Sequence, residues 1–147
     1  MAPLILGTAI YTIWRSQNLV VFHWYAIAGL IPLVADARHA LYAYRSVIPQ
    51  PLLYSLPDAL WVYSFAAALV LIWRRESVSL QKGLWLLLPS MLAVGAEFGQ
   101  ALHLVPGTFD WSDVIAYIIA GILGSTLPKV ALTGRRGKPR REQYVIA

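Results

Sequence analysis

The chain has 147 residues, of which 59% are hydrophobic and only 13% are charged. Soluble globular domains contain about 45–50% apolar and about 25% charged residues, so this composition excludes an ordinary soluble domain and indicates a membrane protein. The net charge is +5, and the absence of cysteine excludes disulfides and thiolate metal sites.

The first apolar segments predict two helices, over residues 3–14 and 18–35. Twelve helical residues reach ~18 Å against a hydrocarbon core of ~30 Å, so the first segment spans only if its helix continues past Arg15. The second segment has the length of a full span, and Pro32 is expected either to kink its last turn or to be tolerated there through neighbouring groups. His23 is interpreted as an interfacial histidine, with a haem or chlorin ligand as the alternative.

Residues 36–57 are too polar for a span and predict an amphipathic stretch along the membrane interface. Such a stretch can close over the mouth of a site between helices, or it can be a plain solvated connection. Pro49 and Pro51 are expected to end any helix in it. The next span is expected over residues 59–73, because Pro57 and Asp58 both suit the start of a helix.

The C-terminal half predicts two more spans, over about residues 84–104 and 111–127. The expected fold class is therefore all-α: a polytopic transmembrane helical bundle of four to five spans in residues 1–132, followed by a basic cytoplasmic tail in residues 133–147. Half of the twelve basic residues lie at or beyond Lys129. A basic flank that faces anionic lipid explains them more simply than a nucleic-acid partner does.

Basic residues also predict the orientation. With five spans, the loop that holds Arg74, Arg75 and Lys82 falls on the same side as the basic tail and Arg15. Segments 36–57 and 105–111 fall on the opposite side. Because cytoplasmic loops are rich in Lys and Arg, the first side is expected to be cytoplasmic and the second side external.

Polar residues in the last two spans predict a site. A carboxylate within a span is costly unless it faces protein or a wet cavity, which makes Glu97 the most informative residue. Steps of three residues place Gln100 and His103 on the same helix face, and Asp113 and Tyr117 are i, i+4 neighbours on the next helix. Antiparallel helices joined by so short a turn pack together, which predicts one polar pocket near the outer surface. The candidate ligand-binding residues are Asp58, Glu97, Gln100, His103, Asp110, Asp113 and Tyr117.

Four interpretations of these residues are open. They can bind a divalent metal, although the histidine–carboxylate i, i+3 pattern occurs only once, and no metal ligand is assigned. They can act as acid and base on an external headgroup, or recognise a lipid or glycan headgroup without chemistry. The single most favoured interpretation is a hydrogen-bond network that locks the two helices together. Gly121 and Gly124 are expected to permit close helix packing.

The same residues carry a resemblance to a family. Glu97-Phe-Gly-Gln100, a short loop, Phe109-Asp110-Trp111 and a glycine-spaced helix that begins near Asp113 resemble the C-terminal half of VanZ-like membrane proteins. Together with Pro57-Asp58, the resemblance covers roughly residues 57–125. The chain departs from the family pattern in lacking a usual Lys, His, Arg and Asn, at positions that include Ala59, Val62 and Tyr117.

The resemblance implies a bacterial inner-membrane protein of the cell envelope, in a family associated with glycopeptide resistance. The first hypothesis is therefore a multi-pass envelope protein, with a cytoplasmic C-terminus, whose outward pocket binds a lipid or headgroup. The alternative is an accessory structural subunit of a photosynthetic or respiratory type of complex. Expected partners are membrane lipids and, through the basic tail, other membrane-protein subunits. Enzymatic activity and cofactors stay open.

Overall fold

The structure of the chain, a computed structural model, describes residues 2–77 and 79–136. All regular elements in these residues are helices, in agreement with the predicted all-α class. Their order is α1 (Ala2–Trp14), α2 (Val20–Ile27), α3 (Ile31–Leu41), the short 3-10 helix η1 (Tyr42–Ser46), α4 (Gln50–Ile72), α5 (Leu80–Ala101) and α6 (Trp111–Arg136). The predicted tail of residues 133–147 begins inside α6, and its residues 137–147 lie outside the described part of the chain.

Three of the described helices are long and apolar enough to cross a membrane: Gln50–Ile72, Leu80–Ala101 and Trp111–Ala131. The predicted count of four to five spans is not confirmed. The helix α1 has 13 residues and ends at Trp14, before Arg15, so it lacks the extension that a full crossing requires.

The segment predicted as a second span, residues 18–35, is two helices with a break between them. Gly29 has a φ of +68°, and it ends α2 in a Schellman motif. In this motif the N–H of Leu30 donates to the carbonyl of Tyr25 at 2.8 Å, and the N–H of Gly29 donates to that of Ala26 at 3.1 Å. Pro32 lies in the first turn of α3, where its missing N–H costs nothing, so it begins a helix and does not kink one.

The helix α4 begins earlier than the sequence predicts. Pro49 is its N-cap residue and Pro51 lies in its first turn, so these prolines start a helix that they were expected to end. Pro57 lies inside α4 and is fully buried. A Cβ atom on Gly7 would lie 3.0 Å from the carbonyl oxygen of Pro57, so α1 packs very closely against α4 at this point.

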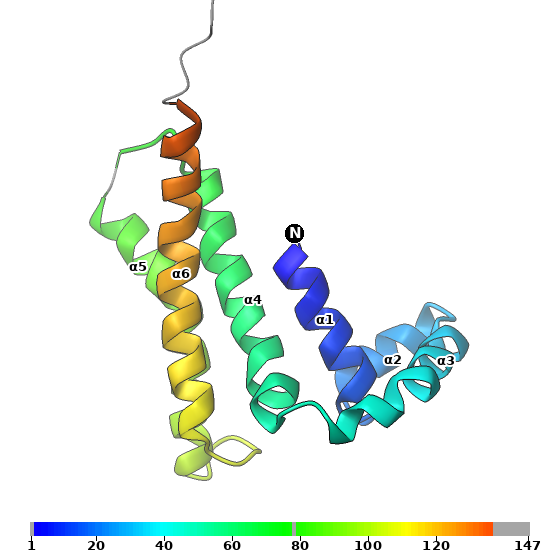
Figure 1. The fold of residues 1–147 in the computed structure, drawn as a ribbon. Coiled ribbons are helices and arrows are strands. Elements are labelled where there is room, and N and C mark those ends of the chain that lie inside the picture. Colours follow the sequence, from blue (N-terminus) through cyan, green and yellow to red (C-terminus); the bar gives the residue numbers. More distant parts are fainter. Residues whose placement is uncertain (1, 78, 137–147) are drawn as a thin grey trace, which may run out of the picture.

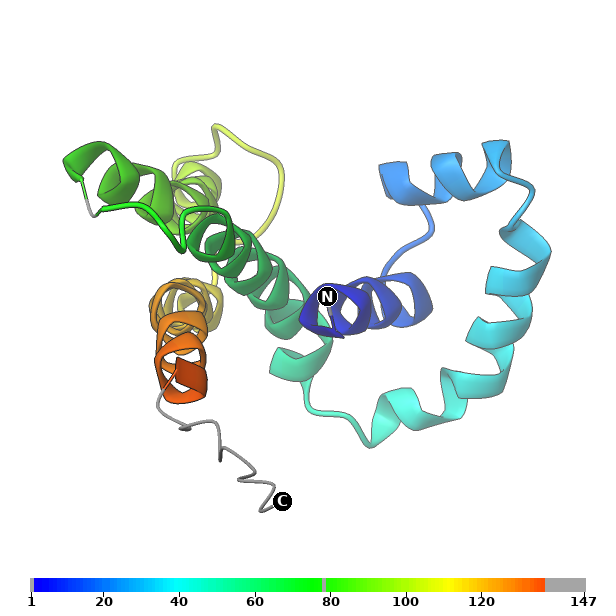
Figure 2. The same ribbon diagram turned by 90° about the horizontal axis from the view of Figure 1, so that it is seen from above.

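The centre of the bundle is the contact between α4 and α6, which run side by side (Figures 1 and 2). Ala66 is completely buried, and a Cβ atom on Gly124 would lie 2.9 Å from its Cβ and 2.5 Å from the carbonyl oxygen of Tyr63. A Cβ on Gly121 would collide with Ser90 of α5. The expectation that both glycines permit close helix packing is therefore confirmed.

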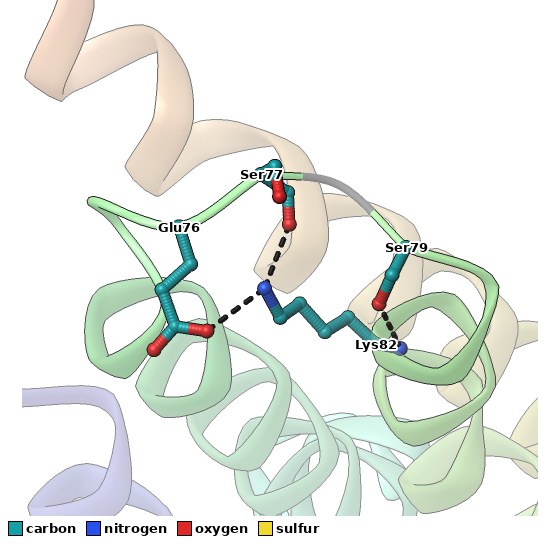
Figure 3. Close-up of polar contacts among 4 residues, drawn as sticks. All are labelled: Glu76, Ser77, Ser79 and Lys82. Carbon is teal, nitrogen blue, oxygen red and sulfur yellow. Dashed lines mark hydrogen bonds and ion pairs between the residues drawn. The ribbon is translucent and has the colours of Figure 1, made fainter.

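The turn between α4 and α5 is held by Lys82 (Figure 3). Its ammonium group donates to the carbonyl of Ser77 at 2.7 Å and lies 2.8 Å from the carboxylate of Glu76. The Ser79 hydroxyl accepts from the Lys82 N–H at 3.3 Å and caps the start of α5. This basic turn lies at the same end of the bundle as the C-terminal end of α6 (Figure 1).

Candidate functional site

The site lies at the opposite end of the bundle, where α4 and α6 begin and α5 ends (Figure 1). Glu97, in the last turns of α5, is only 4% exposed. Its Oε2 atom accepts a hydrogen bond of 3.3 Å from the backbone N–H of Asp110, which precedes α6. A buried carboxylate with this single hydrogen bond retains most of its capacity to accept others.

Two side chains of α6 face the same region. Tyr117 is 5% exposed, and its hydroxyl has no hydrogen-bond partner in the described residues. The Oδ1 atom of Asp113, one turn earlier, is buried and also lacks a partner within residues 2–77 and 79–136. Buried polar atoms without partners are uncommon in folded proteins, so the Asp113 oxygen indicates either a bound group or a local cost to stability.

Asp58 of α4 completes the group. Its carboxylate interacts electrostatically with Asp113, Glu97 and the Tyr117 side chain. Its nearest cation is Arg15, with Nη2 of the arginine 3.7 Å from Oδ2 of the aspartate. We call Asp58, Glu97, Asp113 and Tyr117 the acidic cluster; its three carboxyl groups have one arginine at their edge.

The arginine was not predicted as part of the site. The sequence places Arg15 with the basic loop and tail, but its contact with Asp58 puts it at the other end of the bundle, so that assignment is wrong. The error has a physical cause. Residues 18–35 form two short helices and not one long helix, and α1 and α4 run antiparallel. The C-terminal end of α1 therefore meets the start of α4.

The other predicted site residues, Gln100, His103 and Asp110, make contacts that shape the backbone between α5 and α6. His103 is exposed with a φ of +59°, and it ends α5 in a second Schellman motif. In that motif its N–H donates to Gln100 at 3.0 Å and the N–H of Leu104 donates to Gly99 at 2.8 Å. The left-handed conformation thus uses His103 to stop the helix, and the structure does not bring it into the acidic cluster.

Gln100 and Asp110 shape the connecting loop. Gly107 has a φ of +140°, and a Cβ on it would lie 2.6 Å from Cδ of Gln100, so the loop folds directly over that amide. Asp110 is exposed, and its Oδ1 accepts from the N–H of Ser112 at 2.7 Å, as a helix-capping aspartate does. Their predicted role in binding a ligand stays a prediction.

Three aromatic rings pack together next to the cluster. Phe109 and Trp111 have ring centroids 5.0 Å apart, and Phe98 of α5 lies 5.8 Å from Phe109 and 6.4 Å from Trp111. These contacts fix the loop to the end of α5, because edge-to-face aromatic pairs stabilise a defined geometry. The Asp110 N–H that binds Glu97 lies within this fixed segment.

The chemistry of the cluster follows from its atoms. Within the described residues no three His, Cys, Asp or Glu side chains are grouped so that they could hold a metal ion. The cluster offers carboxylate oxygens and a phenol hydroxyl, which suit a ligand that brings hydrogen-bond donors or positive charge.

The fold and the site together define an all-helical chain with three helices long and apolar enough to span a membrane, and with an acidic cluster at one end. No protein-family model, curated protein or solved structure matches the chain.

Proposed function

We propose that this chain is a multi-pass protein of the bacterial inner membrane, of the VanZ-like type, that binds a polar headgroup of the cell envelope at the acidic cluster. The observation that carries the proposal is the Oδ1 atom of Asp113, which is buried without a hydrogen-bond partner in the described residues, in a cluster with the buried Glu97. A buried site with unused acceptors is better satisfied by a ligand than by the protein alone.

The class of headgroup follows from charge. Three carboxyl groups face one arginine, so an anionic headgroup would be repelled, and an amine would supply both positive charge and N–H donors. Phosphatidylethanolamine has such a headgroup. Phosphatidylcholine is the comparison lipid, because its quaternary ammonium carries the same charge as the amine but has no N–H donor.

The test is the affinity of the full chain for these two lipids in detergent micelles, measured by native mass spectrometry. Wild-type protein is expected to prefer phosphatidylethanolamine. Asp113→Asn and Tyr117→Phe are expected to weaken its binding by about tenfold each, a typical effect of losing a hydrogen bond to a charged group. Asp36→Asn is the matched control, because Asp36 is exposed on α3, outside the cluster. Equal binding by wild type and both cluster variants would refute the proposal.

The proposed orientation has the acidic cluster outside and the C-terminus in the cytoplasm. It is supported by the Arg74–Arg75 turn and Lys82 at the opposite end from the cluster. Since the chain has no cysteine, single cysteines introduced at Thr108 and Ser77 can be labelled without background. A membrane-impermeant maleimide added to spheroplasts is expected to label position 108 at once and position 77 only after lysis. The reverse pattern would invert the orientation.

A second candidate function has its own support. Only 6% of the apolar window of α5 is buried, the least of the three candidate spans. Exposed Trp85, Leu88 and Leu92 make this helix available to another membrane protein. The chain is then an accessory subunit of a photosynthetic or respiratory type of complex, with the acidic cluster as a packing lock. Deletion of residues 134–147 is expected to release it from such a complex, and unchanged co-purification would count against docking through the basic tail.

A further inference from the structure

A second polar feature lies outside the acidic cluster. α2, α3 and η1 form an arc on the far side of α1 from α6 (Figure 2). Between this arc and the segment after α1 is a cleft of about 440 Å³, lined by Gln17, Arg38, His39, Tyr42 and Ala43. The cleft has not been used in the proposed function.

Arg38 is held in a fixed position at this cleft. Its Nη1 atom donates to the backbone carbonyls of Thr12 at 2.6 Å and Arg15 at 3.0 Å, at the C-terminal end of α1. Its guanidinium carbon lies 5.3 Å from the centroid of the Phe22 ring. The Nε and Nη2 atoms have no hydrogen-bond partner in the described residues, so a preorganised cation presents unused donors.

Three other residues that line the cleft carry hydrogen-bond donors. The Gln17 amide, the His39 ring and the Tyr42 hydroxyl each carry a donor, and no carboxylate is among the described residues that line the cleft. An Arg fork with neutral donors beside it is a recurring arrangement for phosphate recognition. The charge preference of this cleft is therefore opposite to that of the acidic cluster.

The arc also places the cleft relative to lipid. α2 exposes Val20, Trp24 and Ile27, with exposed fractions of 61–75%. Of its eight residues only Phe22 is buried, and such an apolar helix is stable only against lipid or another apolar surface. The chain then becomes polar along α3, and exposed Tyr42 and Tyr44 follow, as in the aromatic belt at a membrane surface.

We infer that this cleft binds the phosphate of an anionic phospholipid whose acyl chains lie against the exposed face of α2. Arg38 contacts the phosphate with its free donors, and Gln17 and His39 complete the contact. The inference concerns a site and a lipid class different from those of the proposed function. Either one can fail without the other.

The experiment titrates the full chain in detergent micelles with phosphatidylglycerol and follows the bound lipid by native mass spectrometry. The double variant Gln17→Ala/His39→Ala leaves the Arg38 contacts with α1 intact, so it tests the cleft without removing a fold contact. It is expected to weaken phosphatidylglycerol binding by about tenfold. Arg38→Gln, which also removes the two hydrogen bonds to the end of α1, is expected to abolish binding.

Arg45→Gln is the matched control for charge. Arg45 lies in the neighbouring η1 helix, contacts the Tyr54 hydroxyl at 3.1 Å and does not line the cleft. Unchanged binding by this variant supports a defined site, whereas a loss equal to that of Arg38→Gln would show diffuse attraction and overturn the inference. Wild-type affinity in the double variant would also overturn it. Displacement of the lipid by inorganic phosphate at equal concentration would assign the cleft to a soluble anion instead.

Discussion

The Nη2 atom of Arg15 lies 3.7 Å from Oδ2 of Asp58, which joins the end of α1 to the third turn of α4. The guanidinium carbon of Arg15 lies 5.4 Å from the ring centroids of both Tyr11 and Tyr54. α1 has 13 residues and α4 has 23, and this contact shows where along the long helix the short helix ends. It also supplies the only cation in contact with the acidic cluster among the described residues.

The stability of this contact can be separated into two parts. Asp58→Asn removes the ion pair together with the repulsion between Asp58 and the carboxylates of Asp113 and Glu97. It is therefore expected to lower the free energy of unfolding by at most about 0.5 kcal/mol, because partly exposed pairs contribute little. Arg15→Ala also removes both cation–π contacts and is expected to cost about 1.5 kcal/mol. Equilibrium unfolding in mixed micelles measures both values. Equal losses would show that the tyrosine contacts contribute nothing.

A second prediction rests on the close packing of α6 against α4 at Gly124. Gly124→Ala would drive a Cβ to 2.5 Å from the backbone carbonyl oxygen of Tyr63, which cannot move without shifting α4. Overpacking of this kind costs about 1–3 kcal/mol, so a lower melting temperature in micelles is expected. Gly95→Ala is the control, because nothing lies within 4 Å of a Cβ there, and the better helix propensity of alanine is expected to stabilise it slightly. Equal effects at both positions would contradict the close approach.

Asp113 is expected to reduce stability in the absence of a ligand. Its Oδ1 atom is buried without a partner, and an amide costs less to bury than a carboxylate. Asp113→Asn is therefore expected to raise the free energy of unfolding of delipidated protein by about 1–2 kcal/mol. The Tm of the delipidated variant should exceed that of wild type, even though the variant loses headgroup binding. A lower Tm of the Asp113→Asn variant would show that the Asp113 carboxylate mainly stabilises the fold, as a negative charge at the start of α6.

His103 separates a helix-capping role from a role in binding. Its φ of +59° is unfavourable for a side chain with a Cβ and free of strain for glycine. His103→Gly is expected to stabilise the protein by about 0.5–1 kcal/mol, seen as a rise in Tm, and to leave phosphatidylethanolamine affinity unchanged. A loss of affinity in this variant would restore the histidine to the binding site.

Several features could be predicted from the sequence because they depend on local chemistry. The apolar runs that form α4, α5 and α6 are long enough to span a membrane, regardless of which helices they pack against. The spacing of Asp113 and Tyr117 places them on one face of any helix, and the glycines at 121 and 124 indicate a close neighbour without naming it. The depth of Glu97 within a span likewise predicts a buried polar group, and it is buried.

Other features were decided only in three dimensions. Pro49 and Pro51 suit either the end of one helix or the start of the next, and the structure places them at the start of α4. His103 has a spacing that fits the polar face, yet the backbone needs a left-handed residue there to turn toward α6. The partnership of Arg15 with Asp58 depends on residues 18–35 forming two short helices in place of one long helix, which follows from the Gly29 cap, and on the packing of α1 on α4.

The amino-acid sequence by itself therefore determined that the chain is helical, apolar and built around carboxyl groups in its spans, because hydrophobicity and helical periodicity act over a few turns. Only the tertiary structure decided which end of each helix meets which, and so which cation faces the acidic cluster. Such pairings join residues far apart in the chain, here 15 with 58 and 38 with 12, and no local pattern encodes them.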